Sequence, residues 1–226
     1  MKILALLGLA AALSSWTAYG SSINVSTGLD ASNNLITVGG QPDAHWVVQE
    51  ANGSTGAAQV VEPNNQDWWG APGSGWVPNG PNSAWIARDA NDAFAGLGPY
   101  TFTTTFDLTG ADLSKQVLTG AWAVDDSAVL ALNGTTIATL ARSPGMYPGP
   151  WISLTSFSAS GASMFVNGIN TLSITLTTDD GWDGVRLEES VGPPAGTMTP
   201  EPATWMLLGI GSAVLMLFAG FRKRTS

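Results

Sequence analysis

Period-two alternation of apolar and polar residues is the feature that most restricts how this sequence can fold. It is present in Tyr100–Phe106, where residues 100, 102 and 106 are apolar, and again in residues 172–176. Successive side chains of a β-strand point to opposite faces, so this alternation predicts strands with one buried face. Between residues 21 and 195 no stretch keeps a period of 3.6, and this part of the chain is predicted to be all-β.

Turn signals divide the alternating segments into short strands. The dipeptide Asn133-Gly134, between Val129–Leu132 and Thr136–Leu140, predicts a two-residue β-hairpin. Val185–Glu188 is expected to form a last strand, and Trp85 and Trp122 are expected to lie in the core. Many short strands joined by turns predict a β-sandwich or jelly roll.

The composition excludes several functional classes. The chain has no cysteine, which rules out disulfides, thiolate metal sites and cysteine nucleophiles. Between Ser21 and Thr197 four basic residues face 16 acidic residues, a net charge of −12. Such a surface repels nucleic acid and anionic lipid, so cations or neutral glycans are the expected partners.

The N-terminal segment has the pattern of a secretory signal peptide. Lys2 precedes an apolar run over residues 3–13, and Ala18 and Gly20 place small residues before a cleavage point. We predict a signal peptide over residues 1–20 and a mature chain that begins at Ser21. A buried N-terminal helix is the alternative interpretation.

The C-terminal segment has three parts in a fixed order. After a linker over residues 192–199 come Pro200, Glu201 and Pro202, then the uncharged stretch 203–221. As a helix this stretch would be about 28 Å long, close to the thickness of a bilayer core. The basic cluster Arg222, Lys223 and Arg224 follows and is expected to stop transfer on the cytoplasmic side. An ordinary permanent membrane anchor remains an alternative.

Residues 200–226 resemble the PEP-CTERM sorting domain. The resemblance implies export across the inner membrane of a Gram-negative bacterium that makes exopolysaccharide. It also implies processing by an exosortase, a membrane transpeptidase, near the Pro-Glu-Pro motif. Proline resists entry into a helix interior, so the motif is expected to stay extended at the membrane surface.

Residues 84–190 are similar to galactose-binding-like jelly rolls, the sugar-binding domains appended to glycosidases. An acidic doublet precedes a strand that ends in Asn-Gly, and a later Gly-x-Asn-x-Leu turn leads into the next strand. The segments that carry this similarity are 102–108, 120–126, 129–134, 167–172 and 183–188. The resemblance implies a β-sandwich over residues 21–191. Residues 21–83 lie outside the pattern and are expected to add edge strands and a long loop rich in Trp, Gly and Pro.

No catalytic residues are predicted. A Ser-His-Asp triad would need His45, the one histidine of the chain, but nothing resembles a nucleophile elbow. The doublets Asp125-Asp126 and Asp179-Asp180 suggest the carboxylate pair of a glycosidase. Adjacent strand residues point to opposite faces, however, so neither doublet alone makes an acid–base pair. Turn stabilisation by aspartate is the simpler interpretation.

Two other kinds of site are candidates. Asp179, Asp180 and Asp183 could hold calcium on a loop, although Gly181 and Ser190 replace ligands that an EF-hand requires. Trp68, Trp69 and Trp76 could stack on sugar rings, or they could plug the end of the sandwich core. No other cofactor is expected.

Together these features predict a non-catalytic surface or exopolysaccharide-matrix protein. Its domain would act as a structural or glycan-binding module, and its tail would be an exosortase substrate. A carbohydrate-active enzyme and a permanently anchored membrane protein are the alternatives.

Overall fold

Strands and short turns make up all the secondary structure that the computed structural model describes. It describes residues 23–62, 75–90, 98–142, 149–178 and 181–192, all within a compact unit spanning Ser21–Pro194. The strands are β1 (Ile23–Asn24), β2 (Pro42–Gln49), β3 (Thr55–Val60), β4 (Ile86–Ala87), β5 (Tyr100–Asp107), β6 (Val117–Asp125), β7 (Ser127–Leu132), β8 (Thr135–Leu140), β9 (Thr155–Ser160), β10 (Ile169–Thr177) and β11 (Gly184–Gly192). Two 3-10 turns, η1 (Leu113–Lys115) and η2 (Ala162–Met164), interrupt them. The predicted all-β class is confirmed.

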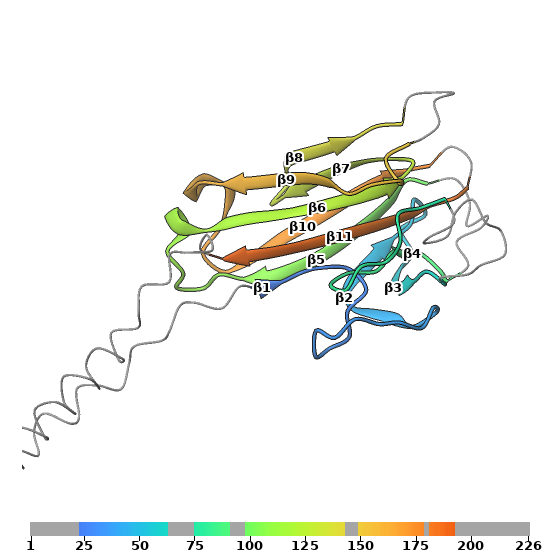
Figure 1. Ribbon diagram of the computed structural model, residues 1–226. Helices are drawn as coiled ribbons and strands as arrows, with labels where there is room; N and C mark the ends of the chain where they lie inside the picture. Colours follow the sequence, from blue (N-terminus) through green and yellow to red (C-terminus); the bar gives the residue numbers. More distant parts are fainter. Residues whose placement is uncertain (1–22, 63–74, 91–97, 143–148, 179–180, 193–226) are drawn as a thin grey trace, which may run out of the picture. The chain divides into compact units, whose positions relative to one another are not determined.

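The strands form two stacked layers that are joined along one side. Every pairing is antiparallel, in the order β8-β7-β10-β5-β2-β3-β4-β11-β6-β9, with β1 added to β11. Figure 1 shows β9, β6 and β11 lying over β7, β10 and β5, and the short strands β3 and β4 connect the two layers. The fold is therefore a jelly-roll-like β-sandwich.

The expectation that residues 21–83 add edge strands holds only in part. β1 pairs with β11 alone, as an added edge strand does. β2 pairs with both β5 and β3, and β3 pairs with β2 and β4, so these two are interior strands. The strand order ends at β8 and β9. Strand order depends on contacts between distant segments, which alternation within one segment does not encode.

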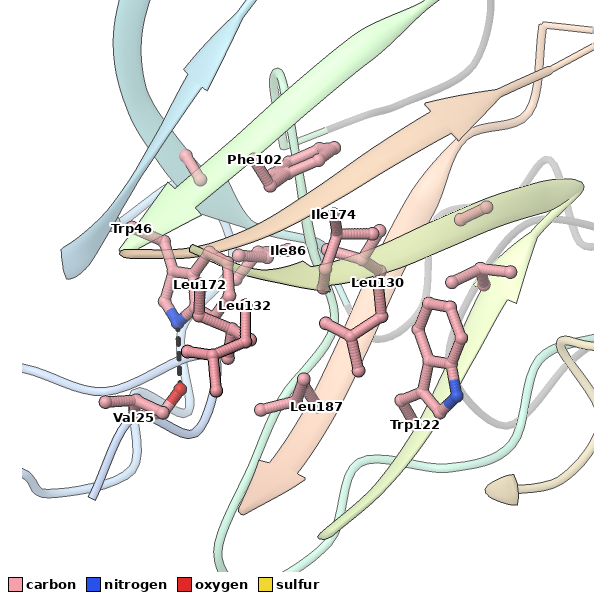
Figure 2. Close-up of a cluster of buried hydrophobic side chains, with 14 of the residues drawn as sticks. Val25, Trp46, Ile86, Phe102, Trp122, Leu130, Leu132, Leu172, Ile174 and Leu187 are labelled. Carbon is pink, nitrogen blue, oxygen red and sulfur yellow. Dashed lines mark hydrogen bonds between the residues drawn. The ribbon is translucent and has the colours of Figure 1, made fainter. Parts of the chain in front are cut away.

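Inward-facing side chains of both layers form the core. Phe102, Leu130 and Ile174 come from one layer and pack with Trp122 and Leu187 of the other (Figure 2). Trp46 is fully buried, and its Nε1–H donates a 3.0 Å hydrogen bond to the carbonyl of Val25. Trp85 and Trp122 are both 0% exposed, as predicted. Replacing a buried tryptophan by alanine costs about 3–5 kcal/mol, so these side chains contribute much of the stability.

The predicted hairpin is present between β7 and β8. Asn133 and Gly134 both have positive φ, 50° and 79°, as the two-residue turn with the right-handed strand twist requires. The side chain of Asn133 also contacts β10, because its amide donates a 2.8 Å hydrogen bond to Oδ1 of buried Asn170. This bond fixes the hairpin to the start of β10.

Candidate functional site: an acidic and aromatic end of the sandwich

Two of the sequence segments singled out for their carboxylates meet at one end of the sandwich. Asp125 is the last residue of β6 and pairs with Gly184, the first residue of β11. Asp183 precedes Gly184, so it lies beside the Asp125-Asp126 doublet. Asp125, Asp126 and Asp183 are all buried, with exposed fractions of 5%, 2% and 0%. Antiparallel pairing of β6 with β11 therefore gathers acidic residues almost 60 positions apart in the sequence.

Asp125 binds a buried tryptophan. Its Oδ2 accepts a 2.6 Å hydrogen bond from Nε1–H of Trp76, whose ring lies 4.3 Å from that of Trp85, centroid to centroid. A Cβ at Gly184 would approach the Trp76 ring to 2.6 Å, so glycine at this position makes room for the indole. Trp76 is 2% exposed and belongs to a second core cluster, which also contains Val61, Trp85, Ala87, Ala123 and Trp151.

This burial corrects one sequence expectation. Trp76 was a candidate for stacking on sugar rings, which requires an exposed aromatic face. In the structure both faces are enclosed, and the alternative interpretation, a plug at the end of the core, describes this residue. The other two candidates, Trp68 and Trp69, lie outside the described residues.

Asp126 binds a different set of partners. Its Oδ1 forms a 2.6 Å ion pair with Nη1 of Arg142, and the hydroxyl of Thr178 lies 3.4 Å from its Oδ2. The Arg142 guanidinium in turn lies 5.4 Å from the ring centroid of Trp151, a cation–π distance. The two aspartates of the doublet thus hold an indole and an arginine in place. This arrangement stabilises the end of the sandwich.

The candidate calcium residues are only partly described. Asp183 is fully buried, while Asp179 and Asp180 lie outside the described residues. Among the residues that the structure describes, no three acidic or histidine side chains are grouped so that they could hold a metal ion. The calcium site therefore stays a prediction.

His45 and its neighbours have a structural role. Nε2 of His45 lies 3.0 Å from the carbonyl oxygen of Asp30, so the ring is tied to a loop. The buried carboxylate of Asp43 accepts hydrogen bonds from the backbone N–H groups of Gly28, His45 and Trp46. Burial raises the pKa of Asp43, and the three N–H donors offset this rise in part.

Sequence reasoning missed a buried glutamate. Glu189 lies on β11 in the same register as Val185, Leu187 and Val191, which all face the core, and it is 6% exposed. Neither carboxylate oxygen has a hydrogen bond of normal geometry among the described residues. Burial raises the pKa of Glu189 to about 9, and the backbone N–H of Val25 opposes this only in part. Strict alternation through Val185, Leu187 and Val191 was the signal that could have placed it inside.

A polar cavity of about 420 Å³ adjoins β1 and β11. Its polar lining comprises Asn24, Ser26, Asn33, Asn82, Thr119, Glu188 and the buried Glu189. The amide of Asn82 donates a 2.9 Å hydrogen bond to Glu188, while the Asn33 side chain makes none among the described residues. The cavity therefore offers both donors and acceptors to a small polar ligand.

The two terminal segments lie outside the described residues, so neither the signal peptide over 1–20 nor the helix over 203–221 is tested by the structure. Within the ranges listed above, no helix has the length and apolar character to cross a membrane.

Comparison with solved structures found distant likenesses. The CBM36-1 domain of a multidomain xylanase from the hindgut metagenome of Trinervitermes trinervoides is 12% identical, with a TM-score of 0.31 over 54% of this chain and 86% of that one. A carbohydrate-binding module CBM36 in complex with calcium and xylotriose is 12% identical, with a TM-score of 0.30 over 51% and 84%. A cyclase from Fischerella sp. TAU is 11% identical, with a TM-score of 0.38 over 76% and 98%.

Comparison by sequence identifies the tail. No curated protein matches the chain. Residues 199–224 match the model described as the PEP-CTERM protein-sorting motif, almost the same residues as the predicted 200–226. The C-terminal segment of this chain therefore carries the PEP-CTERM sorting motif, which marks an exported, surface-sorted protein.

Proposed function

We propose that this chain is a non-catalytic protein of the bacterial cell surface or exopolysaccharide matrix. An exosortase processes its tail, and a galactose-binding-like sandwich serves as a structural or glycan-binding module. The observation that carries the proposal is the sorting motif at residues 199–224. Before processing, the segment 203–221 holds the precursor in the inner membrane, and Arg222, Lys223 and Arg224 stay in the cytoplasm.

The arrangement of the buried aspartates supports a non-catalytic role. Asp125 and Asp126 are engaged with Trp76 and Arg142 inside the fold, and they are only 5% and 2% exposed. A retaining or inverting glycosidase needs two carboxylates on either side of an accessible bond. The acidic end therefore fits a binding or structural module better than a hydrolase.

Glycan contacts and calcium belong to this proposal as well. The −12 surface favours neutral glycans over acidic ones. Trp68 and Trp69 stack on the rings of these neutral sugars. Calcium binds at Asp179, Asp180 and Asp183, and the last of these lies beside the buried Asp125 and Asp126. Carboxylate oxygens are the ligands that calcium prefers.

Replacing Pro200, Glu201 and Pro202 by alanine tests the sorting step. The signal peptide acts independently of the tail, so export should continue while the precursor accumulates in the inner membrane. Immunoblots of membrane, surface and medium fractions measure this. The matched control replaces Pro193, Pro194 and Thr197 in the preceding linker by alanine and should be sorted normally. Normal release of the Pro-Glu-Pro variant at the mature size would refute the proposal.

Replacing Trp68 and Trp69 together by alanine tests the glycan contact. Each stacked ring contributes about 1 kcal/mol, so losing both should abolish retention on a repeating polymer while the melting temperature is kept. A large drop in melting temperature would instead identify these tryptophans as core residues.

A further inference from the structure

One outer face of the sandwich carries no charge over two complete rows of side chains. The face belongs to the layer β8-β7-β10-β5-β2, and the strand register defines the rows. The first row is Gln49, Thr101, Thr175, Val129 and Thr139, and the second is Val47, Thr103, Ser173, Ala131 and Thr136. We call these ten residues the threonine face.

Alternation along the strands shows that these residues point outward. Val48, Phe102, Ile174 and Leu130, which lie between them in the sequence, are buried in the core. The threonine face is correspondingly open to solvent: Val47 is 50% exposed and Val129 is 37% exposed. The face therefore forms part of the surface of the described unit.

Six of the ten side chains bear hydroxyl groups: Thr101, Thr103, Thr136, Thr139, Ser173 and Thr175. None of these hydroxyls makes a side-chain hydrogen bond among the described residues. β-branched threonine has few χ1 rotamers, so its hydroxyl and methyl are held in place at little further entropy cost. Along β2, β5, β10 and β7 the two rows are about 6.7 Å apart, and neighbouring strands are about 4.8 Å apart. On β8 a shift in register sets Thr136 and Thr139 three residues apart. The result is an array of free hydroxyl and methyl groups that is regular over four strands.

The absence of charge on this face contrasts with the rest of the domain. Water-facing sheets usually carry charged residues for solubility, and this chain has a net charge of −12 between Ser21 and Thr197. On the other layer, β11 carries the partly exposed carboxylate of Glu188, which lies 3.4 Å from the buried guanidinium of Arg186. An occupant of the threonine face would displace water from hydroxyls and methyls alone, with no charge to desolvate.

The chemistry of the face favours a polyhydroxylated partner over a protein. Protein interfaces are enriched in aromatic residues, methionine and arginine and depleted in serine and alanine. The threonine face has no aromatic residue, no methionine and no arginine. Neutral sugars, by contrast, present alternating hydroxyl groups and C–H surfaces, which match an array of hydroxyls and methyls.

We propose that the threonine face binds a neutral polysaccharide laid across β2, β5, β10 and β7. This inference rests on the proposed glycan-binding function and adds to it a second contact surface, distinct from Trp68 and Trp69. Many weak contacts along a repeating polymer act together, which compensates for the small contribution of each hydroxyl.

A matched pair of double variants tests the proposal. Thr103 and Ser173 lie directly opposite each other on β5 and β10 within the threonine face. Ser156 and Ser158 lie on the exposed outer face of β9, in the other layer. Thr103→Lys with Ser173→Lys is the test variant, and Ser156→Lys with Ser158→Lys is the control. Both add two lysines at hydroxyl-bearing strand positions, and they lie on different outer faces of the sandwich.

The assay measures depletion of purified protein by microcrystalline cellulose, amylose resin and agarose, with alginate beads as the anionic comparison. The test variant should bind the retained neutral polymer at least tenfold more weakly than wild type, and the control within twofold. If the lysine variant has a lower melting temperature than wild type, a second variant is used. Thr103→Val with Ser173→Ala removes the hydroxyls without adding charge and should also weaken binding.

The remaining outcomes separate the two proposals. Equal binding by wild type and both threonine-face variants would overturn this inference and leave glycan binding through Trp68 and Trp69 intact. Failure of the wild type to bind any of the neutral polymers would overturn both. A dimer in wild type that the test variant converts to a monomer, seen by sedimentation velocity, would show that a second copy occupies the face and would refute the proposal.

Discussion

Replacing Glu189 by glutamine should remove a large part of the pH dependence of stability. Glu189 faces the core, and burial raises its pKa from 4.5 to about 9. Between these values the folded state keeps a proton that the unfolded state has lost. Stability from this group is therefore fully present below pH 4.5 and is lost progressively as pH rises toward 9. Glutamine has nearly the same shape and does not titrate.

The expected size follows from the linkage relation. Each pH unit inside this interval changes the free energy of unfolding by about 1.4 kcal/mol per proton. From pH 5.5 to 7.5, wild type should therefore lose about 3 kcal/mol more than the Glu189→Gln variant. For a domain of this size that corresponds to roughly 6–12 °C in the melting temperature.

Urea unfolding at pH 5.5, 6.5 and 7.5, followed by tryptophan fluorescence, measures the difference. Burying the glutamine amide has a cost that does not depend on pH. It shifts the free energy of unfolding equally at all three pH values, so it cancels when the slopes of free energy against pH are compared. Glu62→Gln is the control, because it makes the same change of side chain at an exposed position. Identical slopes for wild type and Glu189→Gln would refute the argument that a core-facing, protonated carboxylate is present.

Two further predictions concern the acidic end. Trp76→Phe should cost about 2 kcal/mol of unfolding free energy, because a buried carboxylate loses an indole donor at 2.6 Å. Trp85→Phe loses only a hydrogen bond to the neutral carbonyl of Val77, so it should cost about half as much unfolding free energy. Equal costs for the two variants in urea unfolding would contradict this prediction. Millimolar calcium should raise the melting temperature relative to chelator, because a ligand that binds only the folded state stabilises it. Identical melting curves in calcium and chelator would rule out a site at Asp179, Asp180 and Asp183.

Turns and strand faces could be predicted, because they depend on residues that are close together in the sequence. Asn133 and Gly134 tolerate positive φ, so the hairpin between β7 and β8 follows from two residues. The alternation over residues 100–106 placed Phe102 inside and Thr103 outside, as the structure confirms. In both cases the interactions that decide the structure lie within one segment and its immediate neighbour.

Features that depend on distant contacts could not be predicted. Nothing in residues 42–60 shows that β2 and β3 would be interior strands instead of forming an edge. Trp76 stands in a polar stretch rich in glycine and proline, and only the arrival of Asp125 and Gly184 from other strands shows that it is buried. Glu189 was overlooked because a charged residue at a core-facing position contradicts the usual pattern of burial.

The sorting assignment is the central claim, and the intact mass of the surface-exposed protein tests it most directly. Mass spectrometry of protein released from cells should give a chain that begins at Ser21 and lacks the segment 203–226. A mature chain that retains Ala203–Phe221 and the cluster Arg222, Lys223 and Arg224 would contradict exosortase processing and would identify a permanent membrane anchor.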